Sequence, residues 1–257
     1  RPIYEEYKAE AEKARAEGKL RGVGIGCGGF HVGFGIIDVA EVALELNADG
    51  TFTHFSTWED CGQGGDIGAL THAMKALEPL GVKDGQVKLV MGDTKTCPDT
   101  GMAAASRSHL MAGMATINAA NQLMDAMRKP DGTYRTYQEM VAENIPTKYI
   151  GRHDMQNENI IEMDPNNGAN DKSVTYMYCL NLAEVEVDPA TGKTKVLRFT
   201  AVADIGVLGN KLAVDGQAYG GIDHSIGYAL SENYFDIDKH TNIVACGIPE
   251  IEDIPDD

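Results

Sequence analysis

Residues 39–46 alternate apolar and polar side chains in the way that a half-buried β-strand does. Val42 and Leu44 would point to one side of such a strand, and Glu41 and Glu45 to the other. A short turn comes next, and residues 51–56 have the composition of a return strand. The pattern therefore predicts a β-hairpin over this part of the chain.

The rest of the pattern predicts a second hairpin, one further strand and several helices. The second hairpin comprises residues 182–187 and 195–203, and the further strand lies at residues 86–91. Helices are expected at residues 3–17, 67–80, 102–127, 137–143 and 212–230. Residues 130–168 are otherwise polar and irregular, and residues 157–172 have the character of a surface insertion.

A glycine-rich segment at residues 21–30 precedes the first hairpin. Gly24, Gly26 and Gly29 match the G-x-G-x-x-G pattern, which binds dinucleotides only where a helix comes directly after it. Here a hairpin takes that place, so a nicotinamide-dependent dehydrogenase is disfavoured. We interpret these glycines as residues that let two backbones approach closely.

The two hairpins lead into similar segments of the chain. Each return strand runs into Asp-x-Gly, and each half then contains a Gly-Gln pair, at Gly62-Gln63 and Gly216-Gln217. We therefore predict an α+β fold with two related β-hairpin/helix halves, residues 20–130 and 174–235, that face a shared cleft. The alternative is a chance similarity between two ordinary hairpins.

Composition and charge exclude several kinds of partner. The net charge of −17 would repel a nucleic-acid backbone, so we expect no nucleic-acid partner. No run of about 18 apolar residues occurs, so we expect no membrane-spanning segment. An anionic cofactor remains compatible with the charge, because backbone N–H groups at a helix start can hold phosphate.

The five cysteines are spread along the chain and contain no C-x-x-C pair. This spacing argues against a zinc site or an iron–sulfur cluster within these residues. The odd number argues against a disulfide scaffold. A reducing compartment, the cytoplasm, is the simpler expectation.

The ends of the chain lack the features of natural termini. The chain begins at Arg1 without an initiator Met, and residues 254–257 close no recognisable element. We therefore expect it to be a fragment of a longer polypeptide, whose remainder is its first partner.

Gly62, Gln63 and Gly64 form the first segment that could carry chemistry. They lie between a predicted strand and a predicted helix, and glycines there let the backbone approach a ligand closely. Gln63 offers an amide donor and an amide acceptor without adding charge. A simple tight turn is the alternative interpretation.

The second segment is the predicted start of the long helix, with Asp99 or Thr100 as its cap. Small residues in its first turn would leave N–H groups open to an anion, with hydroxyls and a guanidinium nearby. The candidate residues are Ala103, Ala104, Ala105, Ser106, Arg107 and Ser108. Close packing of an alanine-rich helix is the alternative.

Gln217 and His224 share one face of the last long predicted helix. His224 is more often an ordinary polar residue than a ligand. No histidines have metal-ligand spacing, and no carboxylate is marked as a catalytic base. From the residues alone, we infer an anionic-cofactor cleft and no more.

Three segments then occur in a specific order: residues 61–66 (CGQGGD), 101–107 (GMAAASR) and 215–222 (DGQAYGGI). This order resembles the large molybdopterin-binding domain of the xanthine oxidase family. The segments at 121–128 (NQLMDAMR), 201–206 (AVADIG) and 247–255 (GIPEIEDIP) are most similar to aldehyde oxidoreductases of sulfate-reducing bacteria. The resemblance covers nearly the whole chain.

The resemblance implies a molybdenum ion held by molybdopterin cytosine dinucleotide. It places Gln63, between Gly62 and Gly64, near the apical oxo group of the molybdenum. It places residues 103–108 around the pterin or its phosphates, and Gln217 near the cofactor. No residue of this chain is expected to bind the metal itself.

The implied reaction is the hydroxylation of a small-molecule aldehyde by water to a carboxylic acid. The catalytic glutamate of the family lies in a glycine-rich motif that this chain lacks, so no catalytic residue is assigned. The 2Fe–2S clusters, which pass electrons to an unknown acceptor protein, are also expected outside it, and a homodimer is expected. The alternatives are a purine or N-heterocycle hydroxylase of the same family and a non-catalytic pterin-binding or assembly module.

Overall fold

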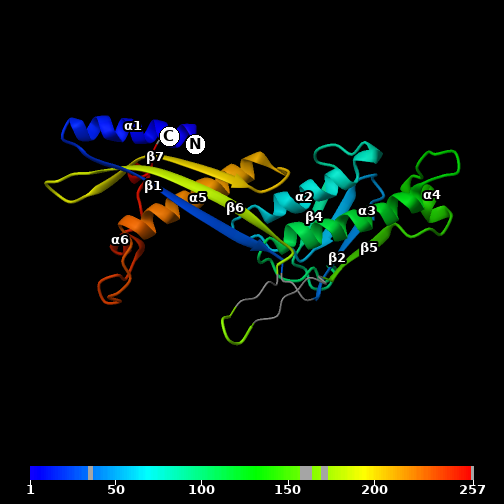
Figure 1. Cartoon of the computed structure of the whole chain (residues 1–257). Coiled ribbons are helices and arrows are strands. Elements are labelled where there is room, and N and C mark those ends of the chain that lie inside the picture. The colour runs from blue at the N-terminus through cyan, green and yellow to red at the C-terminus, as the bar shows by residue number, and fades with distance from the viewer. Residues whose placement is uncertain (34–36, 157–163, 169–172, 256–257) are drawn as a thin grey trace. The chain divides into compact units, whose positions relative to one another are not determined.

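The computed structural model describes residues 1–33, 37–156, 164–168 and 173–255. The chain forms two compact units (Figure 1). Unit 1 comprises Arg1–Gly29 and Met177–Asp257, and unit 2 comprises Phe30–Tyr176. Most of the insertion expected at residues 157–172 lies outside the described residues.

Unit 2 is built on a four-stranded sheet with the order β4-β3-β2-β5. Strands β2 and β3 are the first predicted hairpin, and they pair antiparallel with Leu44 opposite His54. Strand β4 pairs parallel to β3, which requires a crossover between them, and helix α2 supplies it. The strands are β2 (Ile37–Leu46), β3 (Phe52–Ser56), β4 (Val87–Met91) and β5 (Lys148–Gln156).

Helices cover one face of this sheet (Figure 1). They are α2 (Gly65–Ala76), the 3-10 turn η1 (Glu78–Leu80), the π-helix η2 (Ser108–Ala112), α3 (Gly113–Met127) and α4 (Tyr137–Ala142). The buried residues of α3 recur every three or four positions, so the helix turns one apolar stripe toward the sheet. Leu44 of β2, Leu77 and Leu123 of α3 are fully buried together in the core.

Strand β5 was not predicted from the sequence, where residues 130–168 are irregular apart from one short helix. The strand lies at the edge of the sheet and is rich in polar residues, so its alternation is weak. It pairs with β2 along its whole length. Gly151 lets it lie against α3, because a Cβ there would be 2.8 Å from the Cα of Ala119.

Unit 1 contains a three-stranded sheet with the order β1-β6-β7. Its elements are α1 (Pro2–Ala16), β1 (Leu20–Val32), β6 (Thr175–Val187), β7 (Thr194–Asp204), α5 (Lys211–Leu230), α6 (Ile243–Cys246) and the 3-10 turn η3 (Ile251–Asp253). The second predicted hairpin is β6 and β7. The glycine-rich segment is strand β1, and the next element is strand β2, where a dinucleotide motif would need a helix.

Charged side chains hold α1 to this sheet. Glu184 of β6 is buried, and its Oε2 accepts a hydrogen bond of 2.8 Å from the Nε of Arg198 on β7. The Arg198 guanidinium lies 3.9 Å from the ring centroid of Tyr7, whose hydroxyl is 2.9 Å from Thr200 Oγ1. Arg21 of β1 pairs with Glu184 from the other side.

The α+β fold class is confirmed. The compact units differ from the predicted halves 20–130 and 174–235, because β1 joins the sheet of β6 and β7 and β5 completes the other sheet. That the two halves are related remains a prediction. All five cysteines are free thiols. No helix in the described ranges has the length and apolar character to cross a membrane.

Candidate functional site

The glycine turn between β3 and α2 is built around the carboxylate of Asp60. This carboxylate accepts hydrogen bonds from the backbone N–H groups of Gly62 at 2.8 Å, Gly64 at 3.3 Å and Asp66 at 3.1 Å. The bonds from Asp66 and Gly62 hold the pKa of Asp60 below its usual value. Gly62 and Gly64 have φ values of 108° and 84°, which favour glycine. These N–H groups therefore form the turn and are not open to a ligand.

Gln63 lies at the exposed tip of the turn, and its carboxamide is fixed by the backbone on both sides. Its Nε2 donates to the carbonyl of Glu59 at 2.8 Å, and its Oε1 accepts from the N–H of Cys61 at 2.6 Å. Gly65 makes room for this arrangement, because a Cβ there would lie 3.0 Å from Gln63 Nε2. The side-chain amide of Gln63, a candidate from the sequence, is thus held in one orientation at the surface.

The prediction that a helix starts at residue 102 is wrong for the first turn. Helical structure begins only at Arg107 and the π-helix η2, and Asp99 and Thr100 do not cap it. The reason is the Arg107 side chain, whose Nη1 donates to the carbonyls of Thr100 at 2.7 Å and Met102 at 3.2 Å. In a helix, those carbonyls would accept from the backbone N–H groups four residues later.

The consequence is a loop with unpaired donors. Within the described part of the chain, the N–H groups of Ala104, Ala105 and Ser106 make no hydrogen bond. Ala105 and Ser106 have φ values of 47° and 56°, a left-handed conformation that costs a non-glycine residue about 1–3 kcal/mol. The predicted helix-start anion site is therefore corrected to a strained loop of small residues with three unpaired N–H groups.

Arg107 itself is not the free phosphate-binding fork that its sequence position indicated. Its side chain is buried, and its Nε donates to Asp38 at 2.7 Å. Besides the two carbonyls of the loop, its Nη2 donates to the carbonyl of Val39. A Cβ on Gly101 would lie 2.6 Å from the Arg107 Cζ, so only glycine fits beside the guanidinium. Arg107 shapes the loop and binds it to β2.

The structure brings the two candidate segments together within unit 2. The N–H of Ala103 donates to Glu59 Oε2 at 2.5 Å, and Thr57 and Thr100 exchange hydrogen bonds of 2.9 and 3.0 Å between side chains and backbone N–H groups. Glu59 and the Thr57–Thr100 pair were not predicted from the sequence. Their partners are about 40 residues away in the chain, so no local pattern marks them.

The remaining candidates lie in unit 1. Gln217 and His224 are both exposed on α5, and Leu212 and Tyr228 of the same helix are 83% and 85% exposed. Gln217 is thus available to a ligand, but it belongs to a different unit from Gln63 and residues 103–108.

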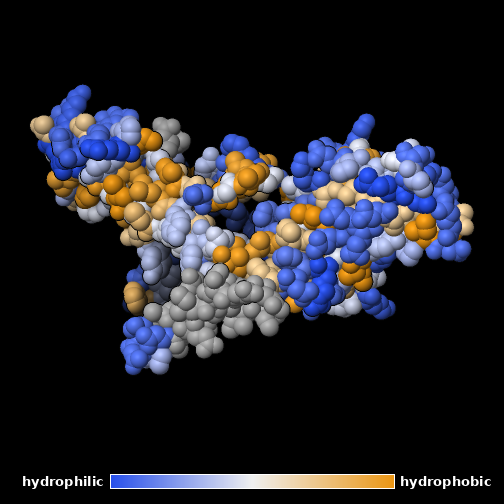
Figure 2. Space-filling model, turned by 45° about the vertical axis from the view of Figure 1, so that its right-hand side comes forward, coloured by the Kyte–Doolittle hydropathy of each residue, from blue (hydrophilic) through white to orange (hydrophobic). Residues whose placement is uncertain are grey.

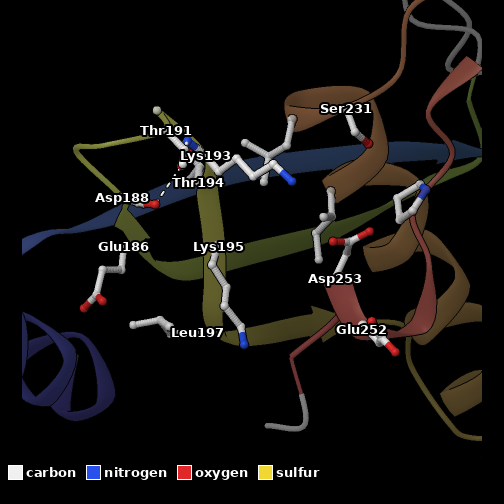
Figure 3. Close-up of a pocket in the computed structure, with 14 residues that line it drawn as sticks. Glu186, Asp188, Thr191, Lys193, Thr194, Lys195, Leu197, Ser231, Glu252 and Asp253 are labelled. Atoms are coloured by element: carbon white, nitrogen blue, oxygen red, sulfur yellow. Dashed lines mark hydrogen bonds between the residues drawn. The ribbon is translucent and has the colours of Figure 1, made fainter.

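Unit 1 also contains a cavity of about 770 Å³, between the β6–β7 turn, the end of α5 and the C-terminal segment. In Figure 3, Lys195 of β7 and Lys193 of the turn before it line one side of this cavity, and Glu252 and Asp253 of η3 line the other. Its charges are mixed, and no candidate residue lines it. Among the described residues, no group of three or more His, Cys, Asp and Glu could hold a metal ion.

Comparisons with known proteins find relatives over the whole length of the chain. A family model described as molybdopterin cofactor-binding domain matches residues 1–255. The chain is 42% identical to the aldehyde oxidoreductase of Megalodesulfovibrio gigas, over 100% of this chain and 28% of that protein. It is 25% identical to the xanthine dehydrogenase molybdenum-binding subunit of Escherichia coli, over 99% of this chain and 37% of that protein.

A solved structure is similar over the same span. The crystal structure of the aldehyde oxidoreductase from Desulfovibrio desulfuricans matches with a TM-score of 0.92 and 42% identity, and the match covers 100% of this chain and 28% of that one. The chain thus spans less than a third of the length of these aldehyde oxidoreductases.

Proposed function

Because the chain belongs to the molybdopterin cofactor-binding domain family, we propose that its two joined loops hold part of a molybdenum–pterin cofactor in an enzyme that oxidises aldehydes. One observation carries this proposal. The unpaired N–H groups of Ala104, Ala105 and Ser106 lie in a loop that Glu59 ties to the Gln63 turn. Such donors suit the oxo groups and phosphates of that cofactor.

The residues present fit the cofactor in their chemistry. Ala104 and Ala105 are partly exposed, Ser106 is exposed, and the Gln63 carboxamide adds a neutral polar group. When bound, the molybdenum centre supplies the two-electron redox chemistry. The chain's own contribution is to bind the cofactor with fixed dipoles and to orient it, which lowers the reorganisation cost of the reaction.

We assign roles on this basis. Gln63, with Gly62 and Gly64 on either side, would hold an oxo group of the molybdenum. Residues 103–106 and Ser108 surround the pterin or its phosphates, and Gln217 contributes from unit 1. Arg107 acts on the cofactor only through the loop that it holds.

The whole protein's properties are part of the same proposal. The reaction is the conversion of an aldehyde and water to a carboxylic acid, with a cytosine dinucleotide form of the cofactor. The general-base glutamate and the 2Fe–2S clusters belong to the remainder of the polypeptide, which delivers electrons to an acceptor protein. A cytoplasmic homodimer is the proposed state, and the five free thiols support a reducing compartment.

The exposed surface of unit 1 supports the proposal that this chain is part of a larger polypeptide. Large hydrophobic residues are exposed on it, including Tyr228 at 85%, Phe235 at 100% and Ile251 at 90%. Figure 2 shows hydrophobic residues, in orange, exposed on the part of the molecule that contains unit 1. Surfaces of this kind are rarely left in water, so we propose that the remainder of the same polypeptide covers them.

A purine or N-heterocycle hydroxylase is the second candidate, favoured by the 25% identity to the xanthine dehydrogenase molybdenum-binding subunit. An activity assay of the intact polypeptide separates the two. Aldehydes and xanthine are offered with a dye as electron acceptor, and we expect oxidation of the aldehydes only. Oxidation of xanthine alone would replace the proposal by the second candidate, and no oxidation of either would favour the non-catalytic module.

A matched pair of variants tests the role of Gln63. We expect Gln63→Ala to lower kcat/KM for the aldehyde at least tenfold, which corresponds to the loss of about 1.4 kcal/mol of stabilisation. Gln122→Ala is the control, because the Gln122 side chain is also exposed and donates to a backbone carbonyl, that of Ile150. Equal activity of the two variants would contradict the assignment.

A further inference from the structure

A pair of histidines lies in unit 2 outside the two loops. His72 is on α2 and His109 is in the π-helix η2, and the His72 Nε2 is 3.1 Å from the His109 Nδ1. Their ring centroids are 4.5 Å apart and the ring planes are inclined by 61°. A π-helix adds a residue to the turn and changes the direction of side chains, and such turns are frequent at functional sites.

The distance between the two nitrogens suits a metal ion as well as a hydrogen bond. Zinc–imidazole bonds are about 2.0–2.1 Å long, so two nitrogens bound at angles between a right angle and a tetrahedral angle lie roughly 2.9–3.4 Å apart. The observed 3.1 Å falls within this range. One ion can therefore bind both nitrogens at this separation, provided that the rings turn so that their lone pairs point at the ion and no longer at each other.

The two rings are also in the protonation state that a metal requires. Burial is the main cause that lowers the pKa of His72 to about 4, and the neighbouring His109 lowers this pKa further. Burial lowers the pKa of His109 as well. Both imidazoles are therefore neutral at neutral pH, and a bound ion does not have to displace a proton into solvent.

Packing holds His72 in place and leaves His109 open. The ring of His72 lies against Gly113, where a Cβ would be 2.6 Å from its Cε1. Trp58 flanks the pair, with ring centroids 5.9 Å from His72 and 6.5 Å from His109. His109 is exposed, so an ion can reach the pair from solvent.

We propose that His72 and His109 form a binding site for a divalent transition metal such as Cu²⁺ or Zn²⁺. The ion replaces the hydrogen bond between the rings, and the proton of that bond moves to the other nitrogen of the same ring. Because no third His, Cys, Asp or Glu of the described residues completes a metal-binding group, water fills the other positions. The two histidines are not among the residues assigned to the molybdenum cofactor, although His109 directly follows Ser108.

Metal titration of the intact polypeptide, freed of loosely bound metal by a chelator, tests this site. Cu²⁺ is added alone and followed by electron paramagnetic resonance, and Zn²⁺ is followed by equilibrium dialysis. We expect one ion per pair, nitrogen hyperfine structure from two imidazoles, and tighter binding of Cu²⁺ than of Zn²⁺. His72→Gln and His109→Gln should each weaken binding at least tenfold, and the double variant should be little weaker than either.

His153→Gln is the matched control, because His153 lies on β5 of the same unit, away from the pair in the chain. Thermal melts establish that each variant is folded. Binding that survives unchanged in both single variants, or that is lost equally in His153→Gln, would overturn the proposal.

Discussion

The replacement of Arg107 by Met should unfold the 101–107 loop and weaken unit 2. Arg107 is 4% exposed, and its guanidinium binds two segments: Asp38 and Val39 of β2, and the carbonyls of Thr100 and Met102 in the loop. Met fills a similar volume but donates no hydrogen bond. The change therefore leaves the carboxylate of Asp38, whose side chain is 11% exposed, without its partner.

The size of the expected loss of stability depends on how deeply the Arg107–Asp38 ion pair is buried. Removal of one partner of a buried ion pair typically costs about 3–5 kcal/mol, against a total stability of about 5–15 kcal/mol for a domain. Since each 1.4 kcal/mol is a factor of ten, the opening equilibrium of the loop should rise roughly a hundredfold to several thousandfold. Arg107→Lys should recover only part of this loss, because an ammonium cannot reach four acceptors on two segments.

Hydrogen–deuterium exchange of residues 99–107, measured by mass spectrometry, is the appropriate assay. Arg152→Met is the control, because Arg152 also pairs with a carboxylate of β2, Glu41, but its side chain is 52% exposed. Exposed ion pairs contribute little, so this variant should exchange as the wild type does. If Arg107→Met also exchanged like the wild type, the buried guanidinium would not be what holds the loop.

Three other changes test separate parts of the structure. Gly151→Ala should lower the free energy of unfolding, measured by urea titration, by about 1–3 kcal/mol because its Cβ would overlap α3. Gly220→Ala, with open space around its Cβ, should not destabilise the protein. Burial lowers the pKa of His54 to about 4, so the unfolded chain binds more protons below pH 6.5. Stability should therefore fall by up to about 3 kcal/mol between pH 6.5 and 4, and urea titrations of His54→Gln should show a shallower slope. Asp60→Ala should speed amide exchange in the turn after β3, and an unchanged rate would show that the carboxylate does not organise it.

Local patterns were sufficient for most of the fold. Alternation and turn residues located both hairpins, and periodicity located α1, α2, α4 and α5. These elements are determined by neighbours in the sequence, which is why they could be predicted. Strand β5 could not, because its place at the sheet edge depends on pairing with β2, more than 100 residues earlier.

The candidate site also contains one part that local sequence predicts and other parts that contacts between distant residues determine. The turn at Gly62-Gln63-Gly64 was predicted, because Asp, Gly and Gln at this spacing are typical of a turn before a helix. The 101–107 loop was not, because its conformation depends on the contact between Arg107 and Asp38, 69 residues apart. The His72–His109 pair spans 37 residues and involves a π-helix, for which the sequence has no recognised signal. The assignment of the cofactor came from resemblance, and the physical pattern gave only an anion site.

The most direct test is the metal and nucleotide content of the intact polypeptide as isolated. Mass spectrometry of the metals, together with analysis of the pterin nucleotide released on denaturation, measures both. We predict about one molybdenum per polypeptide, together with a pterin that carries cytosine dinucleotide. A folded, full-length preparation without molybdenum and without pterin would contradict the proposed function of the two loops.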